Sequence, residues 1–360
     1  MFILIRLPNW LGDGVMFSPA FELLKSHFKD AHFVLVGSIA LDLFANDPRV
    51  AKVYEHKKPK GIFKRIKHTI SLGREIKRKY KPIIAIDATN HAFGALLLQS
   101  SGSKMRIGYS RGAFDVLLTH ALKRQKIAHQ VMEYALLLSP FLAPFLRQII
   151  LPDLKISQSS CKNLQINDFA IAISPGASFG AAKTWPFQYF GALICNLIEQ
   201  NIGQILLLGG PNEKELNNKI LHYVKQKIDN PSEISTKLID LSAQLTIKEL
   251  ANVISKANIF IGNDSGPMHI SVALGVKTIA IFGPTKPFWA YPWCAQKMLF
   301  GELKPILNPN AIVLNKYLFC APCLARICPL KHQNCMFEIT PKQVLCAINR
   351  LKAQHDNQIK

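Results

Sequence analysis

The sequence contains no uninterrupted apolar run of about 18 residues, the length that a membrane-spanning helix needs. The stretch that comes nearest, 134–146, is broken by Pro140 and Pro144, so an interior helix is expected there rather than an apolar membrane contact. The apolar N-terminus includes Arg6 and lacks both the basic start and the small-residue cleavage site of a signal peptide. These absences predict a cytoplasmic protein whose chain begins with a β-strand.

Acidic residues are scarce. The chain has 23 Asp and Glu against 44 Lys and Arg, a formal net charge of +21, and such a surface concentrates anionic ligands such as nucleic acid, phosphorylated glycans or acidic membranes. Eleven Lys or Arg and a single acid, Glu75, lie in residues 57–81, which we call the basic segment. We expect it either to contact an anionic acceptor or membrane or to be the solvated face of a helix. The residues assigned to the first alternative are Lys57, Lys58, Lys60, Lys64, Arg65 and Lys67.

Two familiar nucleotide-binding signatures are also missing. No G-x-G-x-x-G follows the first predicted strand and no Walker loop occurs, which disfavours a dinucleotide oxidoreductase. Eight cysteines without an export signal predict reduced thiols rather than a disulfide framework. Four of them cluster, Cys320, Cys323, Cys328 and Cys335. The C-x2-C start resembles a zinc knuckle, but the other spacings form no second close pair, so reduced thiols are favoured over a zinc site.

Short β-rich runs alternate with longer helical patterns, which predicts βαβ units around parallel sheets. Strands are expected at 2–7, 32–37, 82–87, 105–109, 169–174, 204–210, 237–241, 258–262 and 277–283. Ser18 and Pro19 predict a helix start. The alternation begins again after a polar passage, and 360 residues suffice for two domains. We therefore expect an α/β protein with lobes at 1–155 and 156–360, the C-terminal helix being a candidate to pack back on the first lobe.

Ligands of open parallel sheets bind beyond the carboxyl ends of the strands, and several loops there carry reactive groups. After the first strand, Asp13 stands between two glycines at a helix start, where a carboxylate is either a cap or a general base. In the loop SPGASFGAAKTWP, Ser178 and Lys183 suit a phosphate, although a merely flexible loop is the alternative. Glu213 follows another strand and is either a ribose-binding acid or an ordinary helix N-terminal acid.

The richest loop has the sequence GNDSGPMH. Asp264 or Ser265 could cap a helix that Pro267 begins. Alternatively an anion sits there, held by backbone N–H groups such as that of Gly266 and by the side chain of His269. Asp264 would repel a phosphate, so it is better suited to sugar hydroxyls or to orienting the loop. Three loops of the second lobe thus favour a nucleotide, and Asp13 of the first lobe is left for the reaction.

Three stretches, LPNWLGDGVMFSPA, SPGASFGAAKTWP and GNDSGPMHISVALGVKTIAIFGPT, resemble in order and spacing those of the lipopolysaccharide heptosyltransferases. This resemblance implies a GT-B fold, with two Rossmann-like lobes facing a central cleft, the donor on the C-terminal lobe and the acceptor on the N-terminal one. It implies roles for residues that match the family: Asp13 as catalytic base, Ser178 and Lys183 at the donor diphosphate, Asp264, Gly266 and His269 in a donor-binding D-x-G-x-x-H pattern, and Glu213 and Leu245 near the nucleoside. At position 177, beside Ser178, the family pattern leads us to expect a residue with a hydroxyl group, but this chain has Ala177.

The resemblance further implies an inverting enzyme that moves heptose from ADP-L-glycero-D-manno-heptose onto the inner core of lipopolysaccharide without a required metal or other cofactor. Lys183, His269 and helix N–H groups would then offset the charge of the leaving ADP. PNWLGD and the cysteine cluster resemble heptosyltransferase II, which adds the second heptose to the first. The expected partners are ADP-heptose, a lipid A acceptor bearing Kdo and heptose, and the inner face of the cytoplasmic membrane, with no nucleic acid. The alternatives are heptosyltransferase I acting on Kdo-lipid A, a nucleotide-sugar epimerase, and a basic nucleic-acid-binding protein.

Overall fold

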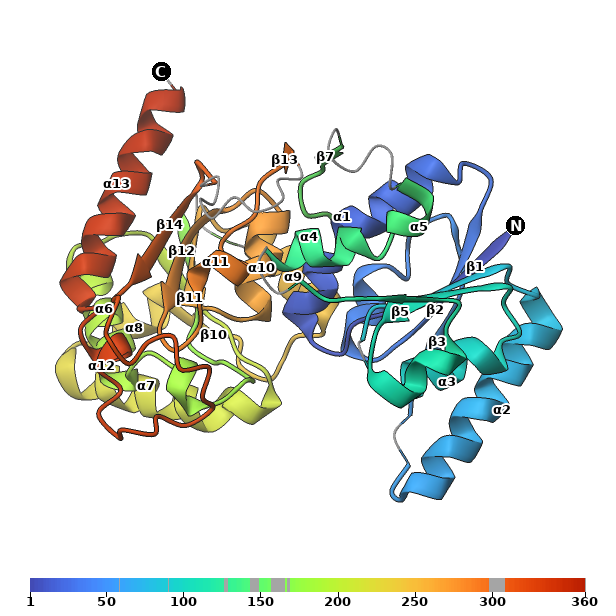
Figure 1. The fold of residues 1–360 in the computed structure, drawn as a ribbon. Coiled ribbons are helices and arrows are strands. Elements are labelled where there is room, and N and C mark those ends of the chain that lie inside the picture. The colour runs from blue at the N-terminus through green and yellow to red at the C-terminus, as the bar shows by residue number, and fades with distance from the viewer. Residues whose placement is uncertain are drawn as a thin grey trace. The chain divides into compact units, whose positions relative to one another are not determined.

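The computed structural model describes residues 1–57, 59–89, 91–125, 129–142, 149–156, 166, 169–297 and 308–359. Contacts divide the chain into two compact units, Met1–Ser157 with Ala295–Leu303, and Gln158–Cys294 with Lys304–Lys360. Each unit is built on its own six-stranded sheet (Figure 1). The return of the chain to the first unit after residue 294 was not predicted from the sequence.

The sheet of the first unit has the strand order β3-β2-β1-β4-β5-β6, and every neighbouring pair is parallel. The strands are β1 (Phe2–Arg6), β2 (His32–Gly37), β3 (Val50–Glu55), β4 (Ile84–Asp87), β5 (Met105–Tyr109) and β6 (His120–Leu122). This is the doubly wound order, in which successive connections change direction between β1 and β4. A short antiparallel pair, β7 (Ile150–Leu151) with β13 (Gln296–Lys297), completes the strands described in this unit.

Helices cover this sheet. They are α1 (Leu11–His27), η1 (Ile39–Leu43), α2 (Ile62–Tyr80), α3 (Ala92–Ser100), η2 (Gly112–Leu117), α4 (Gln130–Leu136) and α5 (Ser139–Leu142). The apolar stretch 134–146 enters α4 and α5. Tyr134 of α4, Leu138 in the turn between the helices and Leu142 of α5 are buried, so its described part is interior as expected; 143–146 lie outside the described residues. No helix in the described parts of the chain is both long and apolar enough to cross a membrane.

Helix α1 begins at Leu11, seven residues before the start predicted at Ser18, and Pro19 lies inside it. Proline cannot donate to the carbonyl four residues earlier, which here belongs to Val15. The Ser18 hydroxyl donates to that carbonyl oxygen at 2.7 Å and so satisfies the acceptor. The Ser-Pro pair was predicted to start a helix, but it lies within a longer one. There the Ser18 hydroxyl replaces the hydrogen bond that Pro19 cannot donate.

The second sheet has the order β10-β9-β8-β11-β12-β14, again all parallel. Its strands are β8 (Ala170–Ser174), β9 (Gln204–Leu207), β10 (Leu238–Asp240), β11 (Ile259–Asn263), β12 (Lys277–Phe282) and β14 (Ala311–Asn315). Taken in chain order within the unit, these strands repeat the arrangement of the first sheet. The change of direction falls between β8 and β11.

The helices of the second unit are η3 (Ala181–Lys183), α6 (Phe187–Glu199), η4 (Pro211–Glu213), α7 (Lys214–Lys227), α8 (Pro231–Lys237), α9 (Ile247–Ser255), α10 (Gly266–Ala273), α11 (Pro287–Ala290), α12 (Asn334–Phe337) and α13 (Pro341–Ile359). The C-terminal helix α13 packs against α6 and β12. Val344, Ile348 and Leu351 of α13 join the apolar core of this unit. The C-terminal helix, for which packing on the first lobe was considered, is thus part of the second unit.

Candidate functional site

The loops that the sequence singled out lie at the points where the two sheets change direction. In the second unit they follow the adjacent strands β8 and β11, with the loops after β9 and β12 on either side. In the first unit, the loop that leads to Asp13 follows β1, next to the loop after β4. Loops at such a point diverge and leave room for a ligand.

An ion pair is the centre of the site in the second unit. Lys183 Nζ lies 2.5 Å from Asp264 Oδ2, and both side chains are largely buried, at 12% and 6% exposed. The hydroxyl of Thr285, in the loop after β12, donates to the same carboxylate oxygen at 2.7 Å. The sequence analysis gave Thr285 no role, although its place after the strand next to β11 would have put it at this edge. Asp264 thus orients the cation that was predicted to meet a phosphate.

The capping interpretation of this loop is wrong. Helix α10 begins at Gly266 with Ser265 as its N-cap residue, but no side-chain cap hydrogen bond forms. The buried Ser265 hydroxyl has no hydrogen-bond partner, and Asp264 points to Lys183 instead. The start of α10 therefore presents first-turn N–H groups that no side-chain cap accepts from, together with the positive end of the helix dipole.

His269 is buried beside this ion pair. Its Nε2 lies 4.0 Å from Asp264 Oδ1, and its Nδ1 makes no hydrogen bond. Burial lowers the pKa of His269 to about 4; the Asp264 charge opposes that change and the Lys183 charge adds to it. The imidazole is therefore neutral near pH 7 in this structure, where it offers hydrogen-bonding capacity. An anion bound beside it would favour protonation, so the contribution of His269 at the leaving group stays a prediction.

The loop between β8 and α6 carries Lys183 and is held at both ends by Asn263, the last residue of β11. The Asn263 amide donates to Pro175 O at 2.6 Å and accepts from Trp185 N at 3.1 Å. Ser178 lies exposed on the turn of this loop. Because both ends are fixed to the neighbouring strand, the loop is a structured element rather than the flexible connection considered as its alternative.

The cysteine-containing segment braces the same loop. The Arg326 carbonyl accepts from Ala182 N at 3.0 Å, and Gln333 Nε2 donates to the carbonyls of Ala181 and Thr184 at 2.9 and 3.0 Å. No motif signalled this brace. Its value is to fix the backbone on either side of Lys183.

The cysteines of that segment lie near one another. Burial raises the pKa of the Cys335 thiol to about 11, and the neighbouring thiols Cys323, Cys328 and Cys320 raise it further. The seven cysteines in the described ranges are free thiols. Among the same residues, no group of three or more His, Cys, Asp or Glu side chains is arranged to hold a metal ion, so the geometry lends no support to a zinc site there.

Glu213 adjoins the loop after β8 from the other side. Its Oε2 accepts from Gly210 N at 2.8 Å, and a Cβ added at Gly176 would lie 1.9 Å from its Oε1. Burial raises the pKa of Glu213. Leu245 is half-buried in the turn before α9, beyond β10 and two strands away from β8. Glu213 therefore sits beside the predicted phosphate loop, and Leu245 lies farther along the same edge.

In the first unit, Asp13 lies in the first turn of α1 and faces a polar pocket of about 220 Å³. The pocket is lined by the loops after β1 and β4 and by residues of β5 and α4, including Asn9, Thr89, Tyr109, Arg124, Gln130 and Tyr134. The Tyr134 hydroxyl donates to Asp13 Oδ1 at 3.1 Å. Burial, and then the Asp13 charge, raise the pKa of Tyr134 well above its usual range. Tyr134 therefore stays a protonated donor to Asp13.

Arg6 holds the loop that leads to Asp13. Its guanidinium donates to Leu7 O at 2.7 Å and to Asn9 Oδ1 at 2.8 Å, and it lies buried near Asp87 at the end of β4. The cation that lines the pocket is Arg124. It donates to Gln130 Oε1 at 2.6 Å and has its Nε 3.7 Å from Glu133 Oε2. The site of the first unit thus combines a fixed carboxylate with polar groups in a hollow open to a ligand.

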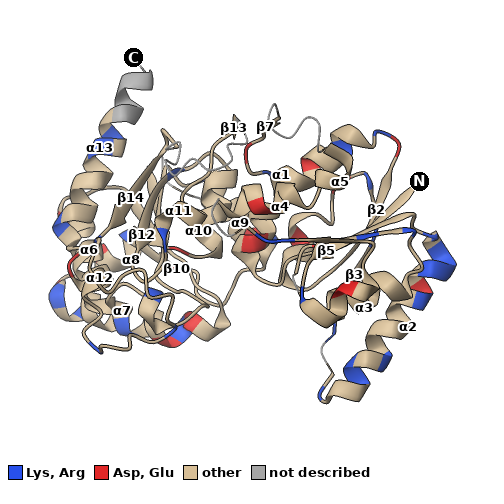
Figure 2. Ribbon diagram, viewed as in Figure 1, with Lys and Arg blue, Asp and Glu red and all other residues tan. Residues whose placement is uncertain are grey.

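Helix α2 makes up most of the basic segment (Figure 2). Lys57, Lys60, Lys64 and Lys67 are exposed, and Arg65 stacks on Phe93, with 4.3 Å between its Cζ and the ring centre. Lys58 lies outside the described residues. These lysines therefore lie at the surface. Their position is compatible both with contact to an anionic acceptor or membrane and with a solvated helix face.

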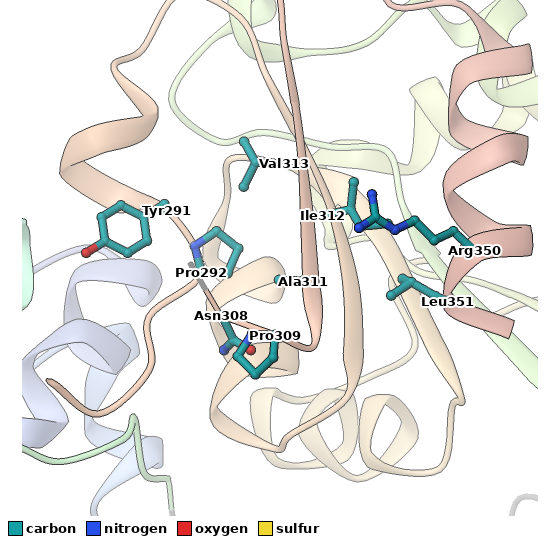
Figure 3. Close-up of a pocket in the computed structure, with 9 residues that line it drawn as sticks. All are labelled: Tyr291, Pro292, Asn308, Pro309, Ala311, Ile312, Val313, Arg350 and Leu351. Atoms are coloured by element: carbon teal, nitrogen blue, oxygen red, sulfur yellow. The ribbon is translucent and has the colours of Figure 1, made fainter. Parts of the chain in front are cut away.

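A separate hollow of about 260 Å³ lies in the second unit between β14, the residues before it and α13 (Figure 3). Tyr291 and Pro292 line one side and Arg350 the other. None of the residues predicted from the sequence for the site lines it. The functional assignment accordingly does not involve this hollow.

The chain matches the model of glycosyltransferase family 9 (heptosyltransferase) over residues 69–332. It is 34% identical to the lipooligosaccharide heptosyltransferase 2 of Campylobacter jejuni, over 99% of this chain and 100% of the relative. It resembles the structure of E. coli ADP-heptose LPS heptosyltransferase II with a TM-score of 0.79 at 22% identity, over 99% of this chain and 100% of that one. It also resembles an E. coli heptosyltransferase solved with ADP-2-deoxy-2-fluoro heptose, with a TM-score of 0.65 at 17% identity, over 97% and 99%.

These solved structures have the GT-B fold, and the paired sheets described above confirm that fold class for this chain. The matched family model and the C. jejuni relative go further than fold. They show that the chain belongs to glycosyltransferase family 9, the heptosyltransferases, and is a glycosyltransferase.

Proposed function

We propose that the protein transfers heptose from ADP-L-glycero-D-manno-heptose to the inner core of lipopolysaccharide, adding the second heptose to the first. The observation that carries this proposal is the joint placement of Lys183, Asp264 and Thr285 at the start of α10. This arrangement lies in a chain whose relative is named lipooligosaccharide heptosyltransferase 2. A structure of the same fold was solved with an ADP-heptose analogue, which supports an ADP-linked donor.

The second unit would hold the donor. The diphosphate would lie against Lys183 and the first turn of α10, where a cation and the helix dipole both favour negative charge. Gly266 and exposed Ser178 offer close backbone approach and a hydroxyl donor. Asp264 would share Lys183 with the diphosphate, and its other oxygen would accept hydrogen bonds from sugar hydroxyls. Neutral His269 would donate a hydrogen bond to a sugar or phosphate oxygen. Glu213 and Leu245 are proposed for the nucleoside.

Asp13 is proposed as the catalytic base. It would take the proton of the acceptor hydroxyl while that oxygen attacks the anomeric carbon. The bond from this carbon to the diphosphate oxygen would break on the opposite face, and its electron pair would leave with ADP, which inverts the configuration. Charge develops on ADP in this step, and Lys183 and the α10 N–H groups would stabilise it. We propose no metal or other cofactor.

The acceptor is proposed to be lipid A bearing Kdo and the first heptose, reached at the inner face of the cytoplasmic membrane. Exposed Lys57, Lys60, Lys64 and Lys67 support this location, because inner-core lipopolysaccharide and the inner leaflet are both anionic. Arg65 and Lys58 of the same segment are included in the proposal on their charge. Nucleic acid is not proposed as a partner.

Product analysis with purified protein tests the function. The protein is incubated with ADP-heptose and with Kdo-lipid A that either lacks or already carries the first heptose. The mass of each acceptor is then measured by mass spectrometry. We expect only the heptose-bearing acceptor to gain one heptose. A gain on bare Kdo-lipid A would assign the first transfer instead, and conversion of the free nucleotide-sugar without acceptor would indicate an epimerase.

Replacing the base gives the first prediction. Asp13→Asn removes the proton acceptor but keeps the shape of the side chain, so turnover should fall between about a hundred- and ten-thousand-fold. ADP-heptose binding, measured by calorimetry, should be unchanged because the donor site lies in the other unit. Asp42→Asn, at an exposed position of the same unit, is the control. Normal turnover by Asp13→Asn would show that another group is the base.

A further inference from the structure

The exposed face of α2 combines apolar and basic residues in separate stripes. Phe63, Ile66 and Ile70 follow one another at helical spacing, and Lys67, Arg74 and Arg78 run beside them. An open hollow of about 760 Å³ runs along this face between the two stripes. The opposite side of α2 packs against the protein: Leu72 and Ile76 are buried, and α2 contacts α3.

Apolar exposure is greatest where α2 begins. Phe63 is 84% exposed and Ile62 is 54% exposed. A large aromatic side chain at that exposure is unfavourable in water, and burying it would be favourable. Single exposed hydrophobic residues are common on protein surfaces. Two adjacent ones at the tip of a helix that carries an apolar stripe are the pattern of an interfacial helix.

The charges of α2 point to the same kind of partner. Its sequence has seven Lys or Arg and one acid, Glu75, and within the described residues its one ion pair between side chains is Lys79 with Glu75. The first turn contains no acid but includes Lys64 and Arg65, and Lys67 lies just beyond it. Positive charge at a helix N-terminus opposes the helix dipole. Within the protein nothing described offsets this conflict, whereas an external anionic surface would.

We propose that α2 is a membrane-docking helix that lies on an anionic lipid bilayer, with Ile62 and Phe63 inserted at the boundary of headgroups and acyl chains. Lys67, Arg74 and Arg78 would contact lipid phosphates while the apolar stripe faces the acyl region. A nucleic acid would satisfy the charges but would leave Ile62 and Phe63 exposed to water beside the half-buried Ile66 and Ile70, so a bilayer is the occupant that fits both stripes. The inference deepens, and rests on, the membrane location proposed above.

Binding to lipid vesicles tests the surface without donor or acceptor. The full-length protein is sedimented with phosphatidylcholine vesicles that contain or lack phosphatidylglycerol. We expect binding only to the anionic vesicles. The variant Lys67→Glu/Arg74→Glu/Arg78→Glu should weaken that binding roughly a hundredfold or more, since each basic residue near such a surface contributes about 1 kcal/mol. The control Lys214→Glu/Lys225→Glu/Lys227→Glu changes the net charge equally at exposed residues of α7 and should retain most of the binding.

A second comparison tests insertion itself. Phe63→Ser should weaken binding about tenfold, whereas Phe319→Ser, at a residue that is 97% exposed in the second unit, should not. Bromine-labelled lipid should quench the fluorescence of the tryptophan introduced by Phe63→Trp, but not the fluorescence of the one introduced by Phe319→Trp. Equal binding by Phe63→Ser and the wild type, or by the two triple variants, would overturn the proposal.

Activity on detergent-solubilised acceptor separates this inference from the proposed function. A Phe63→Ser variant that binds vesicles more weakly but keeps transfer in detergent supports a membrane role. If the wild type binds vesicles but transfers no heptose, the proposed function fails and the docking surface stands. If it transfers heptose but ignores anionic vesicles, the docking proposal fails alone. Circular dichroism of each variant confirms that it is folded.

Discussion

Asp264 shows what a residue's neighbours in the chain can and cannot reveal. Its position before Ser265 and Pro267 suggested a helix cap, which is a local interaction. The structure instead pairs it with Lys183, 81 residues earlier, and with Thr285. The anion alternative could be stated from the residue types, because an uncapped helix start and a lysine suit a phosphate. The pairing of Asp264 with Lys183 could not be predicted, because it depends on which strands are adjacent in the sheet.

Tyr134 is another residue that the sequence analysis left without a role, and it makes a testable contact. Removing its hydroxyl with Tyr134→Phe deletes the hydrogen bond donated to Asp13. A carboxylate that loses such a donor is protonated more easily. If Asp13 is the base, the acid limb of the pH profile of kcat/KM should move up by about one pH unit, with the donor KM little changed.

Tyr109→Phe is the matched control for this measurement. Tyr109 lines the same pocket, but its hydroxyl donates to the Glu133 carbonyl instead of Asp13. Tyr109→Phe can change the rate, but it should leave the acid limb of the kcat/KM profile at the same pH. An acid limb that moves equally in both variants would mean that the pocket as a whole, and not the Asp13–Tyr134 contact, sets the profile.

His269 predicts a pH dependence of stability. The unfolded chain takes up the imidazole proton below about pH 6.5, whereas burial in the folded protein delays this to about pH 4. Between these values the unfolded state binds more protons, so the free energy of unfolding should fall as the pH drops. His269→Gln should show a smaller loss between pH 7 and pH 5 in urea titrations. Parallel losses in both proteins would show that other groups account for it.

At the scale of elements, the pattern of short apolar runs predicted nine of the strands, and the structure has a strand in each of those ranges. Strands β3, β6, β7, β13 and β14 were missed. The sequence of β3, VAKVYE, is half-buried or exposed along its length and lacks the continuous apolar pattern of a central parallel strand, and β6, β7 and β13 have only two or three residues each. The sequence of β14, AIVLN, is largely apolar, but this strand lies at the edge of its sheet and is only half-buried. The start of α1 was misplaced because a Ser-Pro pair inside a helix looks the same in sequence as one at its beginning.

The brace on the loop after β8 leads to a prediction at this scale. Gln333→Ala removes hydrogen bonds to the Ala181 and Thr184 carbonyls, which frees the backbone around Lys183. We expect the KM for the donor to rise several-fold while the free energy of unfolding falls by only about 1–2 kcal/mol. Gln226→Ala, whose exposed amide pairs with His222 on α7, should change neither. An unchanged donor KM in Gln333→Ala would mean that the loop does not need this support.

At the scale of the molecule, composition and alternation predicted two α/β lobes, and two units are present. The strand order of each sheet was beyond the sequence, because the pairing of β1 with β4 or of β8 with β11 leaves no local signature. Those pairings bring the loop of Lys183 beside that of Asp264, and Asn9 beside Thr89. The candidate site could therefore be predicted as a set of loops, and its contacts became visible only with the fold.

Ligand-linked stability gives the prediction for the whole molecule. A ligand that binds only the folded protein at 100 times its Kd adds about 2.7 kcal/mol, so ADP should raise the Tm by several degrees. The double variant Lys183→Met/Asp264→Asn removes both members of the buried pair, and avoids the cost of leaving one charge unpaired. It should unfold near the wild-type Tm without ADP but lose most of the ADP shift. A retained shift would place ADP elsewhere.

The strand β13 has a consequence for how the chain can be divided. It pairs with β7, through Gln296 with Leu151 and Lys297 with Ile150, within the first unit, although it follows most of the second unit in the chain. A gene fragment ending at residue 157 would thus encode a first unit without one of its strands. Conversely, a protease nick between 157 and 168 would leave two pieces that still share a β-ladder, and they should elute together until a denaturant separates them.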